Sequence, residues 1–230
     1  GACHAGLQFF VGYPISPATT ILVWMEENLV GPGKFAYQAS SELESINSVV
    51  GAGFAGKKAM TATSGPGFTL MGEGIGLAWM AEIPCVIVDV QRGGPATGLP
   101  TKTEQSDLYQ AVFGRNADSP LVVISARSPT DCFDVAIEAV RLATKYMTPV
   151  IILSDGYIAN GSEPWLIPNV DELPTIPVEH PGPSTNGEPF MSYQRNERLA
   201  RPWALPGTEG LMHRVGGLEK EDVTGNVSYD

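Results

Sequence analysis

Positive charge is scarce in this 230-residue sequence, which has 14 Lys and Arg residues against 25 Asp and Glu residues and a formal net charge of −11. Proteins that bind a nucleic-acid backbone neutralise its phosphates with clustered Lys and Arg. No basic stripe of that kind occurs here, so nucleic-acid binding is not expected. No apolar run reaches the roughly 18 residues that a membrane-spanning helix needs, so a membrane location is not expected either.

Cysteine and histidine are also sparse. Cys3, Cys85 and Cys132 lie far apart, which fits neither a disulfide framework nor the closely spaced thiolates of zinc and iron–sulfur sites. The sequence therefore predicts a cytoplasmic chain without a metal site of its own. No Ser-His-Asp set stands out at the predicted strand ends, which argues against a hydrolase. Gly1 and Asp230 are both expected to lie within a longer chain.

Apolar runs alternate with amphipathic segments over residues 7–155, and 43% of the sequence is hydrophobic. Strands are predicted at residues 7–12, 35–38, 59–63, 85–90, 121–125 and 150–153, and helices at 17–29, 41–56, 68–81 and 128–147. The β-branched strands are typical of a parallel sheet that is covered on both faces. The pattern predicts one α/β domain over residues 1–160, a doubly wound parallel sheet with helices on both faces.

The sequence changes character after residue 160. Nine of its nineteen prolines fall between Pro164 and Pro206, and residues 161–230 show little periodicity. We expect an extended Pro-rich segment that leads towards a missing downstream domain, with Trp165 and Trp203 anchoring it to a neighbouring surface. A flexible linker is the alternative for the same composition.

Turns rich in glycine, proline and polar residues follow four successive predicted strands. These turns are Gly12-Tyr13-Pro14-Ile15-Ser16-Pro17, Ser41-Glu42, Ser64-Gly65-Pro66-Gly67 and Gln91-Arg92-Gly93-Gly94. Ligands of open parallel sheets bind beyond the carboxyl ends of the strands, where these turns would meet. Because such residues are also common in ordinary turns, each turn alone is a weak signal. Their combination with one acid and one arginine predicts a functional site.

One glycine-rich stretch resembles nucleotide-binding motifs without qualifying as one. Residues 51–58, Gly-Ala-Gly-Phe-Ala-Gly-Lys-Lys, match G-x-G-x-x-G and nearly match a P-loop. Both motifs need a strand before the glycines and a helix after them, whereas here a helix comes first and a strand follows. We interpret Gly51, Gly53 and Gly56 as helix-packing residues, and we interpret glycines 72, 74 and 76 in the same way.

The ordered set of motifs resembles the α subunits of 2-oxoacid:ferredoxin oxidoreductases, most closely the 2-oxoglutarate type. The resemblance rests on Gly12–Thr19, Ser41-Glu42, Thr61–Phe68 and Val88–Thr101, and it continues into the tail through Ala200-Arg201-Pro202-Trp203 and Gly216–Asp222. It covers essentially the whole chain. It implies a thiamine diphosphate-binding fold of the pyrimidine type, without the downstream domain of longer family members.

The resemblance also implies roles for individual residues. Glu42 matches the family glutamate that engages N1' of the cofactor's aminopyrimidine. Ser16 matches a hydroxyl residue that contacts the substrate. Arg92 matches an arginine that can hold the 2-oxoacid carboxylate. The further cofactor-binding residues would be Tyr13, Pro14, Thr63, Ser64 and Gly65. Position alone favours a different interpretation of Glu42, a helix N-terminal acid that the helix dipole stabilises by about 0.3–1 kcal/mol. The alternative for Arg92 is a surface arginine on a turn.

The resemblance further implies that the site is shared between chains. The chain has no motif for Mg²⁺ and the diphosphate and no cysteine cluster, so a β subunit is expected to supply Mg²⁺ and a [4Fe–4S] cluster. The joint enzyme would decarboxylate a 2-oxoacid, pass electrons to ferredoxin and form acyl-coenzyme A. The alternatives are a non-oxidative thiamine diphosphate lyase or carboligase, and a noncatalytic subunit that only scaffolds a partner.

Overall fold

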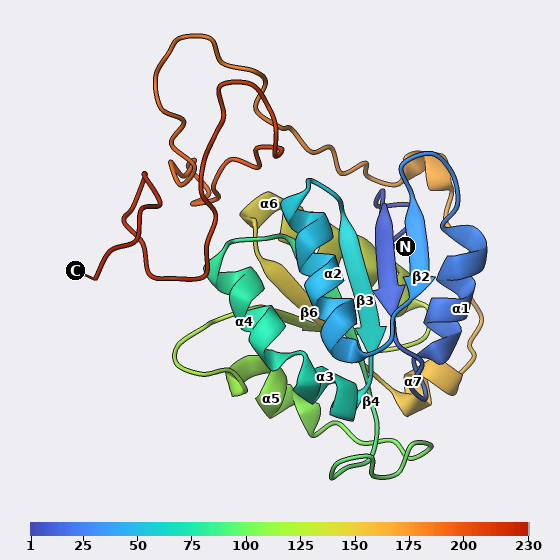
Figure 1. Ribbon diagram of the computed structural model, residues 1–230. Helices are drawn as coiled ribbons and strands as arrows, with labels where there is room; N and C mark the ends of the chain where they lie inside the picture. The colour runs from blue at the N-terminus through green and yellow to red at the C-terminus, as the bar shows by residue number, and fades with distance from the viewer. Residues whose placement is uncertain (230) are drawn as a thin grey trace.

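The computed structural model describes residues 1–229 and contains a six-stranded, wholly parallel sheet (Figure 1). Its strands lie in the order β2-β1-β3-β4-β6-β5. They are β1 (Phe9–Gly12), β2 (Phe35–Gln38), β3 (Ala59–Thr63), β4 (Cys85–Gln91), β5 (Val122–Ser125) and β6 (Pro149–Asp155). The predicted fold class is confirmed.

Helices cover both faces of the sheet. They are α1 (Thr19–Asn28), α2 (Glu42–Phe54), α3 (Gly65–Leu70), α4 (Gly72–Met80), α5 (Asp107–Phe113), α6 (Asp131–Tyr146) and α7 (Gly156–Asn160), with a 3₁₀ turn η1 (Val170–Glu172) in the tail. Helices α1 and α6 enclose one hydrophobic core, and α2 to α5 enclose the other. Among residues 1–229, no helix is long and apolar enough to cross a membrane.

Strands β4 and β6 form the centre of the fold because both are buried along their whole length. They pair in register from Cys85 opposite Pro149 to Gln91 opposite Asp155. Alternate side chains enter opposite cores, so Ile87 packs towards α2 to α5 and Val88 packs towards α1 and α6. This two-sided burial explains the continuous β-branched runs of the sequence.

The helices differ from the sequence prediction in three places. The single helix expected at 68–81 is two helices, α3 and α4. Met71 is both the C-cap of α3 and the N-cap of α4. Helices α5 and α7 were not expected, because they have seven and five residues and are too short for a periodic apolar pattern to stand out.

The tail contains no α-helix or extended strand between Gly161 and residue 229. Trp203 is buried, and its Nε1 donates a 2.9 Å hydrogen bond to the Gly53 carbonyl at the end of α2. Trp165 is 45% exposed and contacts the Phe133 ring. Trp203 therefore anchors the tail as expected, whereas Trp165 packs only at the surface.

Close helix packing requires glycine at some of the suspected positions. A β-carbon on Gly74 of α4 would lie 2.7 Å from Cγ2 of Ile46 on α2, and one on Gly53 would lie 2.7 Å from the Pro84 carbonyl oxygen. Nothing lies within 4 Å of a β-carbon built on Gly51, Gly72 or Gly76. The packing interpretation is confirmed for Gly53 and Gly74 and is wrong for those three.

We predict that Gly74→Ala destabilises the fold while Gly76→Ala, two residues along the same helix, does not. Both variants gain helix propensity, about 1 kcal/mol, but only Gly74→Ala forces a methyl group against Ile46, which costs about 1–3 kcal/mol. Chemical denaturation should place Gly74→Ala below Gly76→Ala in stability. Equal stability of the two variants would contradict the close approach of α2 and α4.

Candidate active site

The carboxyl ends of the strands meet at one edge of the sheet, the lower edge in Figure 1, where α2 and α3 begin. Ser41 caps α2, because its hydroxyl accepts a 3.2 Å hydrogen bond from the Glu44 backbone N–H. This cap fixes Glu42 as the first residue of the helix. Glu44 points to solvent and instead accepts a hydrogen bond from the Ser40 backbone N–H.

Glu42 is buried although it carries an acidic group, with 7% of its surface exposed. Its side chain lies against Gly67 in the first turn of α3, where a β-carbon would be 2.6 Å from Glu42 Oε1 and 2.1 Å from Thr63 Oγ1. The absence of a side chain at Gly67 thus makes the room that the carboxyl group occupies. Within residues 1–229, no hydrogen bond or ion pair reaches the Glu42 carboxyl group.

The turn between β3 and α3 forms the wall beside Glu42. Thr63 and Ser64 are fully buried, and Thr63 Oγ1 makes only a long, 3.5 Å contact to the Ser64 carbonyl oxygen. The Ser64 hydroxyl has no hydrogen-bond partner in the described part of the chain. Buried polar groups normally have partners, so the Ser64 hydroxyl is an unsatisfied hydrogen-bonding group of this turn.

Arg92 follows β4 and is buried, which excludes the interpretation as an exposed turn arginine. Its Nη1 donates to the Ser16 carbonyl oxygen at 2.8 Å and its Nη2 to the Thr97 carbonyl oxygen at 2.9 Å. Arg92 thereby joins the β1–α1 connection to the 93–106 loop. Its Nε has no partner among residues 1–229, and each Nη keeps one further N–H.

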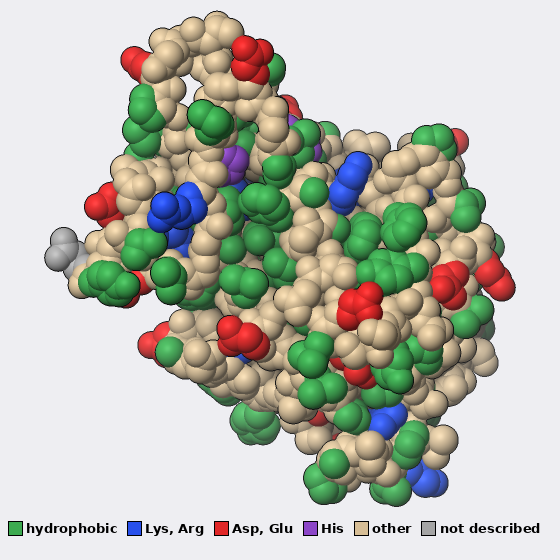
Figure 2. All heavy atoms as spheres, viewed as in Figure 1, with side chains coloured by type: hydrophobic (Ala, Val, Ile, Leu, Met, Phe, Trp, Pro, Cys, Tyr) green, Lys and Arg blue, Asp and Glu red, His purple; other side chains and the backbone are tan. Residues whose placement is uncertain are grey.

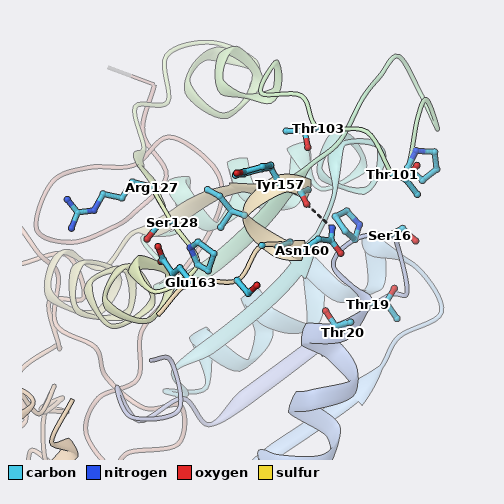
Figure 3. Close-up of a pocket in the computed structure, with 18 residues that line it drawn as sticks. Ser16, Thr19, Thr20, Thr101, Thr103, Arg127, Ser128, Tyr157, Asn160 and Glu163 are labelled. Carbon is cyan, nitrogen blue, oxygen red and sulfur yellow. Dashed lines mark hydrogen bonds between the residues drawn. The ribbon is translucent and has the colours of Figure 1, made fainter. Parts of the chain in front are cut away.

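Ser16 is exposed and lies at one end of a cavity of about 820 Å³ (Figure 3). The cavity runs from Thr19 and Thr101, past the α7 residues Tyr157 and Asn160, to Ser128 and Glu163. Glu42 and Arg92 do not line it. The structure therefore brings Ser16 and Arg92 together through the Ser16 backbone, while the Ser16 hydroxyl and Glu42 belong to separate parts of the edge.

Tyr13 and Pro14 lie on the β1–α1 connection, with Tyr13 39% exposed and Pro14 partly buried. Two acidic residues at this edge, Asp89 and Asp107, were not singled out from the sequence. Gly67 was noted only as part of a turn. Its proximity to Glu42 depends on how α2 and α3 pack, which no local pattern encodes.

The residues present fit the aminopyrimidine group that the sequence led us to expect. A buried carboxyl group without a partner favours a ligand that brings a hydrogen-bond donor to it. Gly67 makes room for the Glu42 carboxyl group itself, and the Ser64 hydroxyl has no partner within residues 1–229. Within residues 1–229, no group of three or more His, Cys, Asp or Glu side chains is placed to hold a metal ion.

The helices near the site carry exposed apolar side chains. Leu43, Leu70, Leu108 and Phe113 come from α2, α3 and α5, and each is at least 46% exposed. Hydrophobic groups are spread over this face in Figure 2, and the Lys and Arg side chains visible there are scattered in small groups. A continuous basic surface is therefore not present on this face.

Comparisons with known proteins match the whole chain to one family. The family model described as pyruvate flavodoxin/ferredoxin oxidoreductase, thiamine diphosphate-binding, matches residues 1–228. The chain is 52% identical over 232 aligned residues to the 2-oxoglutarate oxidoreductase subunit KorA of Mycobacterium tuberculosis, covering 98% of the chain and 34% of that protein. It is 44% identical to the 2-oxoglutarate synthase subunit KorA of Archaeoglobus fulgidus, covering 97% of the chain and 60% of that protein.

A solved structure gives the same result for the fold. The 2-oxoglutarate:ferredoxin oxidoreductase from Magnetococcus marinus, with 2-oxoglutarate, coenzyme A and succinyl-CoA bound, superposes on the full chain with a TM-score of 0.91 and 42% identity. The match covers 39% of that solved chain. The present chain therefore spans only part of the length of the relatives it matches.

We predict that Gly67→Ala destabilises the protein by about 1–3 kcal/mol, because the new methyl group must displace the Glu42 and Thr63 side chains. Gly72→Ala, at the start of the next helix with nothing within 4 Å of its β-carbon, is the matched control. Removing Oγ1 with Thr63→Ala should reduce the cost of Gly67→Ala by about 0.5 kcal/mol or more in a double-mutant cycle. Additive costs, measured by chemical denaturation, would contradict the contact.

Proposed function

The chain belongs to the pyruvate flavodoxin/ferredoxin oxidoreductase, thiamine diphosphate-binding family, and we propose that it forms the aminopyrimidine-binding half of the active site in the α subunit of a 2-oxoacid:ferredoxin oxidoreductase. The proposed reaction is the oxidative decarboxylation of 2-oxoglutarate to an acyl-coenzyme A, with electrons passed to ferredoxin. The chain belongs to a longer protein in this proposal, because its relatives extend well beyond the matched region.

The observation that carries the proposal is Glu42, a buried residue whose carboxyl group has no hydrogen-bond or ion-pair partner within residues 1–229. A structural acid at a helix N-terminus normally points to solvent or caps backbone N–H groups, as Glu44 does with Ser40. Glu42 is buried, caps no backbone N–H group within residues 1–229, and lies in the room that Gly67 leaves. Burial without a partner is costly, so this arrangement is best explained by a ligand that completes it.

In the proposed mechanism Glu42 holds a proton against N1' of the aminopyrimidine. When bound, thiamine diphosphate would supply the carbanion chemistry and the electron sink for decarboxylation of a 2-oxoacid. Glu42 would share a proton with the ring nitrogen and so set the protonation state of the ring. Thr63, Ser64 and Gly65 shape the wall beside the ring, with Tyr13 and Pro14 at its border.

We propose that Arg92 and Ser16 orient the substrate. Arg92 retains one N–H on each terminal nitrogen and the N–H of Nε, which suits a carboxylate ligand. Its two hydrogen bonds to backbone carbonyls keep the guanidinium in place before substrate arrives. The exposed Ser16 hydroxyl, next to the carbonyl that Arg92 binds, is the second substrate group. The choice of 2-oxoglutarate rests on the names of the relatives.

A partner chain is part of the proposal. We propose that a β subunit supplies the Mg²⁺ and diphosphate-binding residues and the [4Fe–4S] cluster that passes electrons to ferredoxin. The exposed apolar side chains on α2, α3 and α5 favour contact with another protein at these helices. The proposed location of the complex is the cytoplasm.

We predict that Glu42→Gln, in the complete protein with its partner, lowers the rate of viologen reduction by about 100-fold or more. The amide cannot exchange a proton with N1', and acid–base groups of this kind contribute about 10²–10⁴-fold. The assay contains 2-oxoacid, coenzyme A and thiamine diphosphate with Mg²⁺. Glu73→Gln is the control, since Glu73 is also an acid in the first turn of a helix but is exposed.

An unchanged rate in a folded Glu42→Gln complex would refute the role of Glu42. Activity that requires neither coenzyme A nor an electron acceptor would indicate a lyase or carboligase. A complex without thiamine-dependent turnover would indicate a scaffolding subunit.

We further predict that 2-oxoglutarate has a kcat/KM at least about tenfold above that of pyruvate. Arg92→Lys should raise KM for both substrates, because a lysine cannot make two parallel hydrogen bonds and also hold the Ser16 and Thr97 carbonyls. A reversed preference in a substrate panel would replace 2-oxoglutarate with pyruvate in the proposal. An unchanged KM in Arg92→Lys would remove Arg92 from substrate binding.

A further inference from the structure

Asp89 is an acid in the interior of the sheet. It lies on β4, opposite Thr63 of β3 and Leu153 of β6, and it is fully buried. Among residues 1–229, no N–H or hydroxyl group donates to either of its carboxyl oxygens. None of the salt bridges in this part of the chain involves it. A charged carboxylate in such a place is very unfavourable.

The group that faces Asp89 is a second carboxyl group, that of Asp107 at the start of α5. Asp89 and Gln91 lie on the same face of β4, and the Asp107 backbone N–H donates to Gln91 Oε1, so α5 begins beside Asp89. Asp107 Oδ2, like both Asp89 oxygens, is buried without a partner within residues 1–229. A hydrogen bond between the two carboxyl groups would satisfy them. Such a bond requires that one of them carries a proton, because two carboxylates have no donor between them. Two acids that share one site resist being ionised together, so such a site favours keeping one proton.

The surroundings keep the proton on this pair. Burial and then the charge of Asp107 raise the pKa of Asp89 well above its ordinary value. Burial also raises the pKa of Asp107, with a further rise from Glu104 on the 93–106 loop and an opposing effect from the hydrogen bond to Asp89. The neighbouring strand residues Thr63 and Leu153 are neutral, and so is Gln91.

The pair lies directly behind the turn that borders Glu42. A β-carbon on Gly65 would be 3.3 Å from Asp107 Oδ2, so the acid contacts the first residue of α3. The Asp107 backbone N–H donates a 3.1 Å hydrogen bond to Gln91 Oε1 on β4. Thr69 and Gln110 hydrogen-bond between α3 and α5. Asp107 therefore occupies the junction of β4, α3 and α5.

We propose that Asp89 and Asp107 share one proton across the β4–α5 contact, and that this acid pair positions the Ser64–Gly67 turn beside Glu42. The link to cofactor binding rests on the proposed function. The shared proton would make an O–H···O⁻ hydrogen bond, which is of the charge-assisted kind. Its loss would place two like charges together and push α5 away from β4 and from Gly65. Both acids are positioning residues and touch no reacting atom.

The shared proton can be observed directly in the complete protein, in its native complex. The infrared spectrum should contain the carbonyl band of a protonated carboxyl group at neutral pH, and the band should shift in D₂O. Asp89→Asn should remove it, and the exposed control Asp118→Asn should not. A wild-type spectrum without a band that Asp89→Asn removes would overturn the shared proton.

The pH dependence of local stability tests the same point. Because the folded pKa of Asp89 is raised, the folded state keeps a proton that the unfolded state loses above about pH 4. The stabilisation from this proton is fully present below that pH and is lost as the pH rises towards the folded pKa of Asp89. Over this range the equilibrium constant for local opening should increase by up to about tenfold per pH unit. Hydrogen exchange of residues 85–113, corrected for intrinsic rates, should show this trend in wild type and Asp118→Asn but not in Asp89→Asn. Identical trends in all three would overturn the proposal.

The positioning role is tested by cofactor affinity, with thiamine diphosphate and Mg²⁺ titrated into the complex. Asp107→Asn keeps a hydrogen bond to Asp89 and should bind within about threefold of wild type, whereas Asp107→Leu should bind at least about tenfold more weakly. Equal affinity of Asp107→Leu and wild type would overturn the positioning role. Failure of wild type itself to bind would refute the proposed function, while the infrared result would still decide the shared proton.

Discussion

The parallel pairing of β1, β3, β4 and β6 is the constraint on which the rest of the molecule depends. Parallel strands end at the same edge, and here each end is followed by a turn that carries a polar or glycine residue. Parallel pairing also requires crossover helices, which bury the strands on both faces. Groups that are far apart in sequence, such as Glu42, Arg92 and Asp107, are therefore held around one rigid edge rather than on independent loops.

Close approach at this edge depends on glycine. Gly67 leaves the space in which the Glu42 carboxyl group lies, and Gly65 leaves the space against which the Asp107 carboxyl group rests. The two glycines belong to the same turn of α3, so one backbone segment contacts an acid on either side. A side chain at Gly67 would move Glu42, and a shift of α5 would move Gly65. The geometry at Glu42 is thus set by the packing of three helices against β3 and β4.

The sequence was sufficient for the sheet and for much of the edge, because hydrophobic periodicity reports burial and strand order places the turns. It was not sufficient for α5 and α7, because helices of seven and five residues are too short to show a clear helical repeat of apolar residues. The position of Arg92 also depended on tertiary structure, since its partners are the carbonyls of Ser16 and Thr97. From the sequence, Asp89 is simply part of a predicted strand. No local signal indicates that Asp107, 18 positions later at the start of a helix, would face it. The roles of Glu42, Ser16 and Arg92 stay predictions.

Glu42 and Asp89 pose the same physical problem, which is the burial of an acidic side chain without a cation beside it. Each is a buried acid near the carboxyl edge, and neither has a cation or a backbone N–H group as partner within residues 1–229. In our proposal Asp89 shares a proton with Asp107, an acid of the same chain. The Glu42 carboxyl group lies against Gly67 and the Thr63 side chain and has no hydrogen-bond or ion-pair partner within residues 1–229. An acid that shares a proton within the chain is part of the scaffold, whereas an acid that no group of the described chain binds is available to a ligand. By this criterion Glu42 is the binding group of the edge, and the acid pair supports the turn beside it.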